Sequence, residues 1–240
     1  MRLLKECRFL AGLIMAFPVL ALSCQVRANT TDSIATPLKV SILGDSYSTF
    51  EGWVPEGYDI WYRTVPPKGR DTDVTKVEQT WWKKYIDQKG YILEANNSFS
   101  GATVCNTGYD GNDYSAKSFV NRTGLLGNPD LIFVFGGTND SWAGSPLGEY
   151  VWDDWTPEQA YSYRPALAQM TYNLINSYPN ARIVFLINDG IDEEVKNSTK
   201  KVCDHYNVQY IQLEGIEKKT GHPDERGMQQ IVEQIIEAGL

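Results

Sequence analysis

Short apolar runs alternate along the chain with longer segments whose apolar residues recur at helical spacing. The run at residues 131–135 (LIFVF) is apolar at every position, which is typical of a strand buried on both faces. Strands are predicted over residues 38–43, 91–94, 131–135, 181–187 and 208–213. Helices are predicted over residues 77–89, 156–178, 192–206 and 224–238.

This alternation of strands and helices predicts an α/β fold with a mostly parallel sheet, helices on both faces and right-handed crossovers. Two helices have clear apolar faces that should turn toward the sheet. Their members are Trp81, Trp82, Tyr85 and Ile86 in the first, and Met228, Ile231, Val232 and Ile235 in the last. The sequence has no internal repeat and no linker to a second domain, so residues 38–240 are interpreted as one domain.

The first 28 residues have the pattern of a signal peptide. Arg2, Lys5 and Arg8 precede an apolar run over residues 9–22, which suits a signal sequence better than a membrane span. Cleavage after Ala28 would leave a polar lead-in at residues 29–37. We therefore expect a periplasmic or extracellular protein. An imperfect lipobox before Cys24 leaves lipid anchoring as an alternative, and only then would the protein sit on a membrane.

Composition narrows the remaining choices. The net charge is -8 and basic clusters are absent from the sequence, so nucleic acid is a poor partner. The chain has two histidines, which argues against a histidine-rich metal site. Export permits a disulfide between Cys105 and Cys203, although two separate buried thiols fit the sequence as well. The oligomeric state is not predicted.

Polar and glycine-rich segments follow the predicted strands. They are GDSYS at residues 44–48, SFSGA at 98–102, GGTND at 136–140 and GHP at 221–223. Ligand sites of parallel α/β sheets lie beyond the carboxyl ends of the strands, so these segments should meet at one edge.

Acyl transfer needs a hydroxyl nucleophile, an imidazole base and hydrogen-bond donors for the oxyanion. Ser46, His222, the Gly101 N–H and the Asn139 amide supply one of each. Taken singly, each residue also has a plain explanation as a turn or cap residue.

With these four blocks in this order, the chain resembles the SGNH (GDSL-type) esterase/acylhydrolase family. The resemblance implies a flavodoxin-like three-layer sandwich with about five parallel strands and helices on both faces. It implies that Ser46 is the nucleophile, that His222 is the base, and that Ser46 N–H, Gly101 N–H and Asn139 form the oxyanion hole. Supporting roles in the loops are implied for Asp45, Gly137 and Asp140. No metal or organic cofactor is implied.

One position departs from the family pattern. The family usually places an aspartate three residues before the histidine, and this chain has Lys219 there. Lysine cannot orient and stabilise an imidazolium as a carboxylate does. Three explanations are open: a Ser–His dyad with a backbone carbonyl on Nδ1, a substitute acid such as Glu217 (with Glu214 further back), or lost activity.

Aromatic residues are concentrated in two loops that follow catalytic blocks. They are Phe50, Trp53, Tyr58, Trp61 and Tyr62 in the first, and Trp142, Tyr150, Trp152 and Trp155 in the second. Such rings stack on sugars or contact acyl chains, and they also serve as a satellite core beneath long loops. With export, they favour a short acyl ester, such as acetyl, on a glycan as the substrate. The alternatives are a lysophospholipid or other lipid ester, and a degenerate hydrolase fold that only binds carbohydrate.

Overall fold

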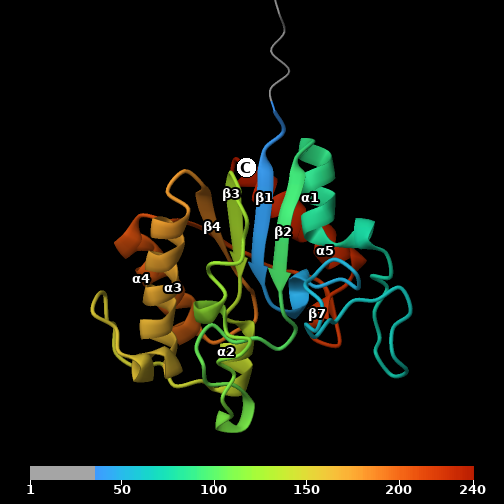
Figure 1. Cartoon of the computed structure of the whole chain (residues 1–240). Coiled ribbons are helices and arrows are strands. Elements are labelled where there is room, and N and C mark those ends of the chain that lie inside the picture. Colours follow the sequence, from blue (N-terminus) through green and yellow to red (C-terminus); the bar gives the residue numbers. More distant parts are fainter. Residues whose placement is uncertain (1–35) are drawn as a thin grey trace, which may run out of the picture. The chain divides into compact units, whose positions relative to one another are not determined.

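Five parallel strands form the central sheet of the protein, in the order β2-β1-β3-β4-β5 (Figure 1). The computed structural model describes residues 36–240. The strands are β1 Lys39–Gly44, β2 Ile92–Ser98, β3 Leu131–Phe135, β4 Arg182–Ile187 and β5 Gln209–Gln212. The register aligns their carboxyl ends, because Gly44 lies opposite both Ser98 and Phe135. The segments that leave these three strands therefore start at one level of one sheet edge.

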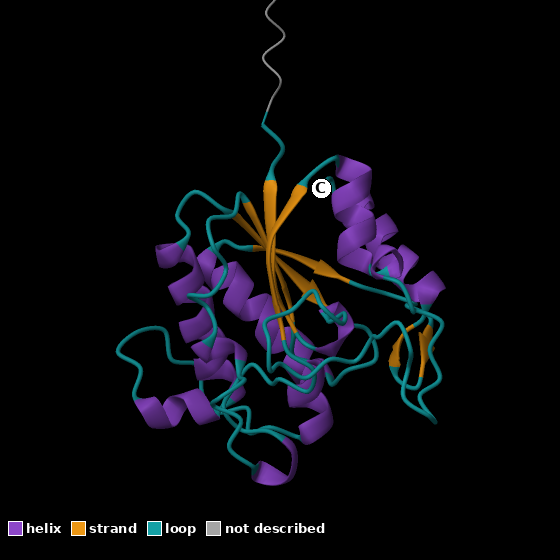
Figure 2. Cartoon of the chain, turned by 45° about the vertical axis from the view of Figure 1, so that its right-hand side comes forward, coloured by secondary structure: helices purple, strands orange, loops and turns teal. Residues whose placement is uncertain are grey.

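Helices cover both faces of this sheet, as Figures 1 and 2 show. The α-helices are α1 Trp81–Lys89, α2 Thr138–Ala143, α3 Tyr163–Ser177, α4 Glu193–Tyr206 and α5 Glu225–Glu237. Helices α1 and α5 pack together on one face, and α3 and α4 pack together on the other. Short 3₁₀ helices lie at Ser46–Ser48, Val77–Gln79, Tyr109–Gly111, Phe119–Asn121 and Pro157–Tyr161. The predicted α/β sandwich is thus confirmed.

The pleat of β3 explains its unbroken apolar run. Phe133 and Phe135 point into the cluster beneath α1 and α5, whereas Ile132 and Val134 point into the cluster beneath α3 and α4. A strand with helices on both faces has no side that can carry polar residues at low cost. The apolar faces predicted for α1 and α5 are also buried, since each of their eight named residues is at most 4% exposed.

The structure differs from the predicted elements in five places. The helix expected over residues 77–89 is divided into the 3₁₀ helix Val77–Gln79 and α1, and the strand expected over residues 91–94 continues to Ser98. The helix expected over residues 156–178 is divided, with the 3₁₀ helix Pro157–Tyr161 separated from α3 at Ser162, whose backbone is extended. Helix α2 was not predicted, because its six residues are too few to show a helical period. A two-stranded hairpin, β6 Lys218–Lys219 and β7 His222–Pro223, was also not predicted.

The predictions for the N-terminal segment lie outside the described residues. They concern the signal segment at 1–28, Cys24 and most of the lead-in at 29–37. Within residues 36–240, no helix is both long enough and apolar enough to cross a membrane. Cys105 and Cys203 are both buried and free, so the structure has the two separate thiols rather than the disulfide.

Candidate active site

Ser46 begins a short 3₁₀ helix directly after β1. Gly44 makes this sharp exit from the sheet possible, because a Cβ there would lie 2.8 Å from the Ser48 Cβ and closer still to the Ser98 Oγ. Asp45 caps the helix by accepting a hydrogen bond from the Tyr47 N–H at 3.0 Å. Ser46 is therefore held at the carboxyl end of the sheet, and it is 3% exposed.

The His222 ring reaches Ser46 from the opposite end of the sequence. Its Nε2 lies 2.9 Å from the Ser46 Oγ, and its Nδ1 lies 3.0 Å from the backbone carbonyl of Thr220. A carbonyl oxygen can only accept, so Nδ1 carries the proton and donates it to Thr220. The Nε2 lone pair is then free to accept the hydroxyl proton of Ser46.

A tight hairpin makes this contact with Thr220 possible. Lys219 pairs with His222 across β6 and β7. The two residues between them have positive φ angles, 49° at Thr220 and 73° at Gly221, as a two-residue type I′ turn requires. This turn folds the Thr220 carbonyl back toward the imidazole. The residue that holds His222 was missed in the sequence because it acts through its backbone, although a glycine at the second turn position is a hairpin signal.

Two buried tyrosines hold the hairpin by hydrogen bonds to its backbone carbonyls. The Tyr47 hydroxyl donates to the Gly221 carbonyl at 2.6 Å, and the Tyr62 hydroxyl donates to the Pro223 carbonyl at 2.7 Å. Tyr47 follows Ser46 directly in the sequence, and Gly221 directly precedes His222. The hydrogen bond between them therefore links the segment of the nucleophile to the segment of the base. The orientation of His222 is thus set by the scaffold on either side of it.

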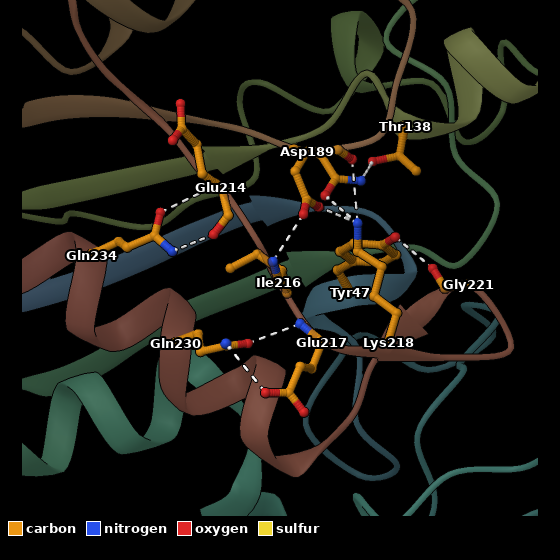
Figure 3. Close-up of polar contacts among 11 residues, drawn as sticks. Tyr47, Thr138, Asp189, Glu214, Ile216, Glu217, Lys218, Gly221, Gln230 and Gln234 are labelled. Carbon is orange, nitrogen blue, oxygen red and sulfur yellow. Dashed lines mark hydrogen bonds and ion pairs between the residues drawn. The ribbon is translucent and has the colours of Figure 1, made fainter.

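Lysines 218 and 219 anchor the first strand of the hairpin. The Lys219 ammonium lies 2.6 Å from Asp73 Oδ2, while Lys218 pairs with Asp189 (Figure 3). Lys219 therefore joins the hairpin to the loop after the nucleophile. The position that the family gives to the acid is used here for a structural ion pair.

Neither upstream glutamate reaches His222. The Glu217 N–H and side chain face Gln230 on α5, with the N–H donating to Gln230 Oε1 at 2.8 Å, and Glu214 pairs with Gln234 on the same helix (Figure 3). Among the ion pairs of residues 36–240, none joins a carboxylate to His222. The structure thus brings His222 together with a backbone carbonyl and not with Glu217.

Burial makes this imidazole a weak base. It lowers the pKa of His222 from 6.5 to about 4, and the positive charges of Arg70 and Lys218 act in the same direction. The hydrogen bond to Thr220 opposes the shift without cancelling it. His222 is accordingly neutral near pH 7, which is the state that a general base requires.

The expected oxyanion donors come from two other strand ends. Asn139 lies in the first turn of α2, with its amide held by the Tyr109 hydroxyl on Oδ1 and the Ala102 carbonyl on Nδ2, each at 2.9 Å. One N–H of the amide is left for a ligand. The N–H groups of Ser46 and Gly101 make no backbone hydrogen bond within residues 36–240.

Glycine is required at the turn before Asn139. Gly137 has a φ of 91°, and a Cβ there would lie 2.9 Å from the Tyr163 hydroxyl. A side chain would therefore displace the start of α2 and the amide with it.

The two buried aspartates support the loops and do not touch His222. Asp140 accepts the N–H groups of Val104 and Cys105, at 2.8 and 3.2 Å. Burial raises the pKa of Asp140 to about 6 and that of Asp45 to about 7. The Asp45 Oδ2 has no hydrogen-bond partner, which fits a carboxyl that is easily protonated. Residues 36–240 contain no group of three ligand side chains placed to hold a metal.

The aromatic loops divide between the site and the core. Trp61 stacks on His222 with ring centres 3.4 Å apart and an interplanar angle of 7°, and Trp142, 43% exposed, stands edge-on to the imidazole. Phe50 and Tyr62 are core residues. Tyr150, Trp152 and Trp155 pack against the cluster beneath α3 and α4, so they are the expected satellite core.

Comparisons with known proteins identify a family model and solved structures that are similar to this chain. The family model for GDSL-like lipase/acylhydrolase matches residues 38–238. The search of curated proteins gave no match. Crystal structures described as GDSL-like lipases from Bacteroides ovatus and Bacteroides uniformis are similar, at 52% and 50% identity and TM-scores of 0.83 and 0.82. The matches cover 85% of this chain in both cases, and 98% and 95% of those chains.

A more distant structure shares the fold. It is a carbohydrate esterase at 16% identity with a TM-score of 0.61, covering 85% of this chain and 68% of that chain.

Proposed function

The chain belongs to the GDSL-like lipase/acylhydrolase family, and we propose on that premise that it cleaves carboxylic esters through an acyl-Ser46 intermediate. The observation that carries the proposal is the 2.9 Å contact between His222 Nε2 and Ser46 Oγ, with the other ring nitrogen held by a carbonyl. A nucleophile, a base in contact with it and a group that orients the base together make an activated serine. No carboxylate is needed to place them, so the dyad is the mechanism we favour.

The first half of the reaction acylates the serine. His222 Nε2 takes the hydroxyl proton as Ser46 Oγ bonds to the ester carbon, and the carbonyl oxygen becomes an oxyanion. The donors available to it are the N–H groups of Ser46 and Gly101 and the Asn139 amide. When the intermediate collapses, the C–O bond to the alcohol breaks and the imidazolium returns its proton to the leaving oxygen.

Water completes the cycle by the same groups. His222 removes a proton from water as the water oxygen attacks the acyl-Ser46 carbon, and the second oxyanion uses the same donors. Collapse releases the carboxylic acid and restores the Ser46 hydroxyl with the proton held by His222. The Thr220 carbonyl keeps Nδ1 protonated throughout, so Nε2 is always the nitrogen that exchanges protons.

The substrate we propose is a glycan that carries short acyl groups such as acetyl. Its support is the half-exposed ring of Trp142 beside the catalytic imidazole, where it can stack on a sugar. A fold neighbour described as a carbohydrate esterase is compatible with this choice. The export proposed from residues 1–28 is also compatible with it, since extracellular glycans are the accessible pool. Lipid anchoring at Cys24 remains the alternative to a free exported protein.

The alternative function is that of a protein that only binds carbohydrate, which the lysine at position 219 suggests. The pairing of Lys219 with Asp73 gives the residue a structural task that leaves the Ser46–His222 contact intact. An inactive descendant has no need for a serine hydroxyl aligned with an imidazole. We therefore favour an active enzyme.

A series of p-nitrophenyl esters from acetate to palmitate tests the function. The mature domain should hydrolyse the acetate ester fastest, and Ser46→Ala should reduce turnover to background with an unchanged circular dichroism spectrum. A serine-directed phosphonate should label the parent protein and not this variant. A preference for esters with long acyl chains would indicate a lipid ester as the substrate. Equal rates for both proteins on every ester would exclude the enzyme.

A further inference from the structure

An ammonium group borders the space above the Gly101 N–H. The Nζ of Lys117 lies 3.6 Å from the point that a Cβ on Gly101 would occupy. Apart from the two sequence neighbours of Gly101, no other residue of 36–240 comes within 4 Å of that point. Gly101 has a φ of 77°, a conformation that favours glycine, and the absence of a side chain leaves the space beside its backbone open. The ammonium is therefore within reach of a ligand bound beside Gly101.

Aromatic rings hold Lys117 at this place. Its Nζ lies 4.0 Å from the centre of the Tyr114 ring and 5.6 Å from that of Phe99. The side chain is half-buried, and burial lowers the pKa of Lys117, with Asp59 acting in the opposite direction. These aromatic contacts position the ammonium beside Gly101.

A second cation lies on the histidine side of the site. The Arg70 guanidinium carbon is 4.0 Å from the centre of the Trp61 ring, and its Nη1 donates to the Trp61 carbonyl. Trp61 is the ring that stacks on His222. One positive group thus lies on the His222 side of the site and another beside Gly101.

These two cations differ from the lysines of the hairpin. Lys218 and Lys219 are neutralised by Asp189 and Asp73. No carboxylate lies within 4.0 Å of Lys117 or Arg70 anywhere in the described part of the chain. Ten of the eighteen lysines and arginines in the described chain have no Asp or Glu carboxylate within this distance, so what distinguishes Lys117 and Arg70 is their place beside the site. A ligand carboxylate bound there would supply the counter-ion that both lack.

We propose that the substrate is an acidic glycan, whose sugar carboxylate binds Lys117 while its acyl ester enters the oxyanion hole, with Arg70 adding positive potential from the other side. This inference rests on the proposed esterase function and narrows its substrate class. A lysine against a carboxylate at a half-buried site gives a charge-assisted hydrogen bond, which is stronger than a neutral one. The same contact is absent for a neutral sugar, so the site discriminates by charge.

Two sugars that differ only at C6, with a carboxylate in one and a hydroxymethyl group in the other, provide the test. They are methyl glucuronoside and methyl glucoside, each carrying one acetyl group at the same ring position. We expect kcat/KM to favour the acidic sugar roughly tenfold or more, the range of one charge-assisted hydrogen bond. Lys117→Gln should remove most of this preference, and Lys117→Arg should retain part of it. Added salt should weaken the preference in the parent protein.

Lys201→Gln is the matched control. The Lys201 ammonium lies 4.1 Å from the Tyr150 ring, so it has the same kind of aromatic contact as Lys117, but it belongs to α4, which supplies no residue of the site. This variant changes the net charge equally and should keep the preference of the parent. If Lys201→Gln lowers the preference as much as Lys117→Gln does, general charge explains the effect and the inference is overturned.

Further outcomes separate the inference from the esterase itself. Ser46-dependent hydrolysis of p-nitrophenyl acetate without any preference for the acidic sugar would overturn the inference and leave the esterase standing. Equal losses on both sugars in Lys117→Gln would assign Lys117 to the oxyanion and also overturn it. Binding of the unacetylated sugars to Ser46→Ala, measured by calorimetry, tests recognition without turnover, and equal affinities for the two sugars would refute the acidic-glycan site.

Discussion

The acid side of the pH–rate profile tests how His222 is held. In the free enzyme, kcat/KM follows the fraction of His222 that is unprotonated. Burial, with help from the charges of Arg70 and Lys218, lowers the pKa of this imidazole to about 4. Activity should therefore persist to acid pH and then fall about tenfold for each further pH unit.

The expected size of the effect follows from that pKa. At about pH 5.5 a base with a pKa of about 4 is about 97% unprotonated, whereas one with a pKa of 6.5 is only about 9% unprotonated. The ratio of kcat/KM at about pH 5.5 to that at about pH 8 should then be near one. An ordinary histidine would give a ratio of about 0.1.

The assay is initial-rate hydrolysis of a short ester across this range, with Ser46→Ala measured at each pH as the background. Proton NMR gives a second readout, because the chain has only two histidines and His205→Gln leaves the His222 signal alone. NMR is needed because burial raises the pKa of Asp45 to about 7 and that of Asp140 to about 6, so both titrate in the same window. A His222 signal that titrates near 6.5 would refute the argument from burial.

Three substitutions test other parts of the site. Asn139→Ala should lower kcat on the order of 10²–10³-fold, the scale of one oxyanion donor; a loss below tenfold in the same ester assay would remove the amide from the hole. Glu217→Gln should keep kcat within about twofold, because its side chain faces Gln230, and a large loss with an intact fold would restore it as the acid. Tyr47→Phe removes the 2.6 Å bond to the Gly221 carbonyl and should cost about 1 kcal/mol in the free energy of unfolding. Urea denaturation measures this cost, and an unchanged midpoint would show that the bond does not hold the hairpin.

Much of the fold and the order of the site residues could be predicted from local pattern. The run at β3 is apolar throughout because helices cover both faces of that strand, so its sequence alone indicates its depth. Ser46 and Asn139 are far apart along the chain, yet parallel strands bring their ends to one edge. This is why a rule about strand ends located them without any structure.

The support of His222 could not be predicted, because it depends on pairings with no local signature. Lys219 contacts Asp73, which is 146 positions away in a loop without a regular period. The Thr220 carbonyl is a backbone group that any residue would supply, so side-chain identity carries no trace of it. Trp61 was one of several loop aromatics, and only the packing of the loop separates it from the core residue Tyr62.

An acid partner does two things for a catalytic histidine: it fixes the ring, and it stabilises the positive charge of the imidazolium. In this chain the hairpin does the first, with Thr220 on Nδ1 and with Tyr47 and Tyr62 on the flanking carbonyls. The stabilisation of the imidazolium is only partly replaced. The Thr220 carbonyl is a dipole without a full negative charge, and the positive charge of Arg70 disfavours protonation of His222. The stacked face of Trp61 supplies attraction that appears only when the imidazole is protonated. The absence of the acid should therefore show as a slower proton transfer and a wider acid range, and not as a misplaced base.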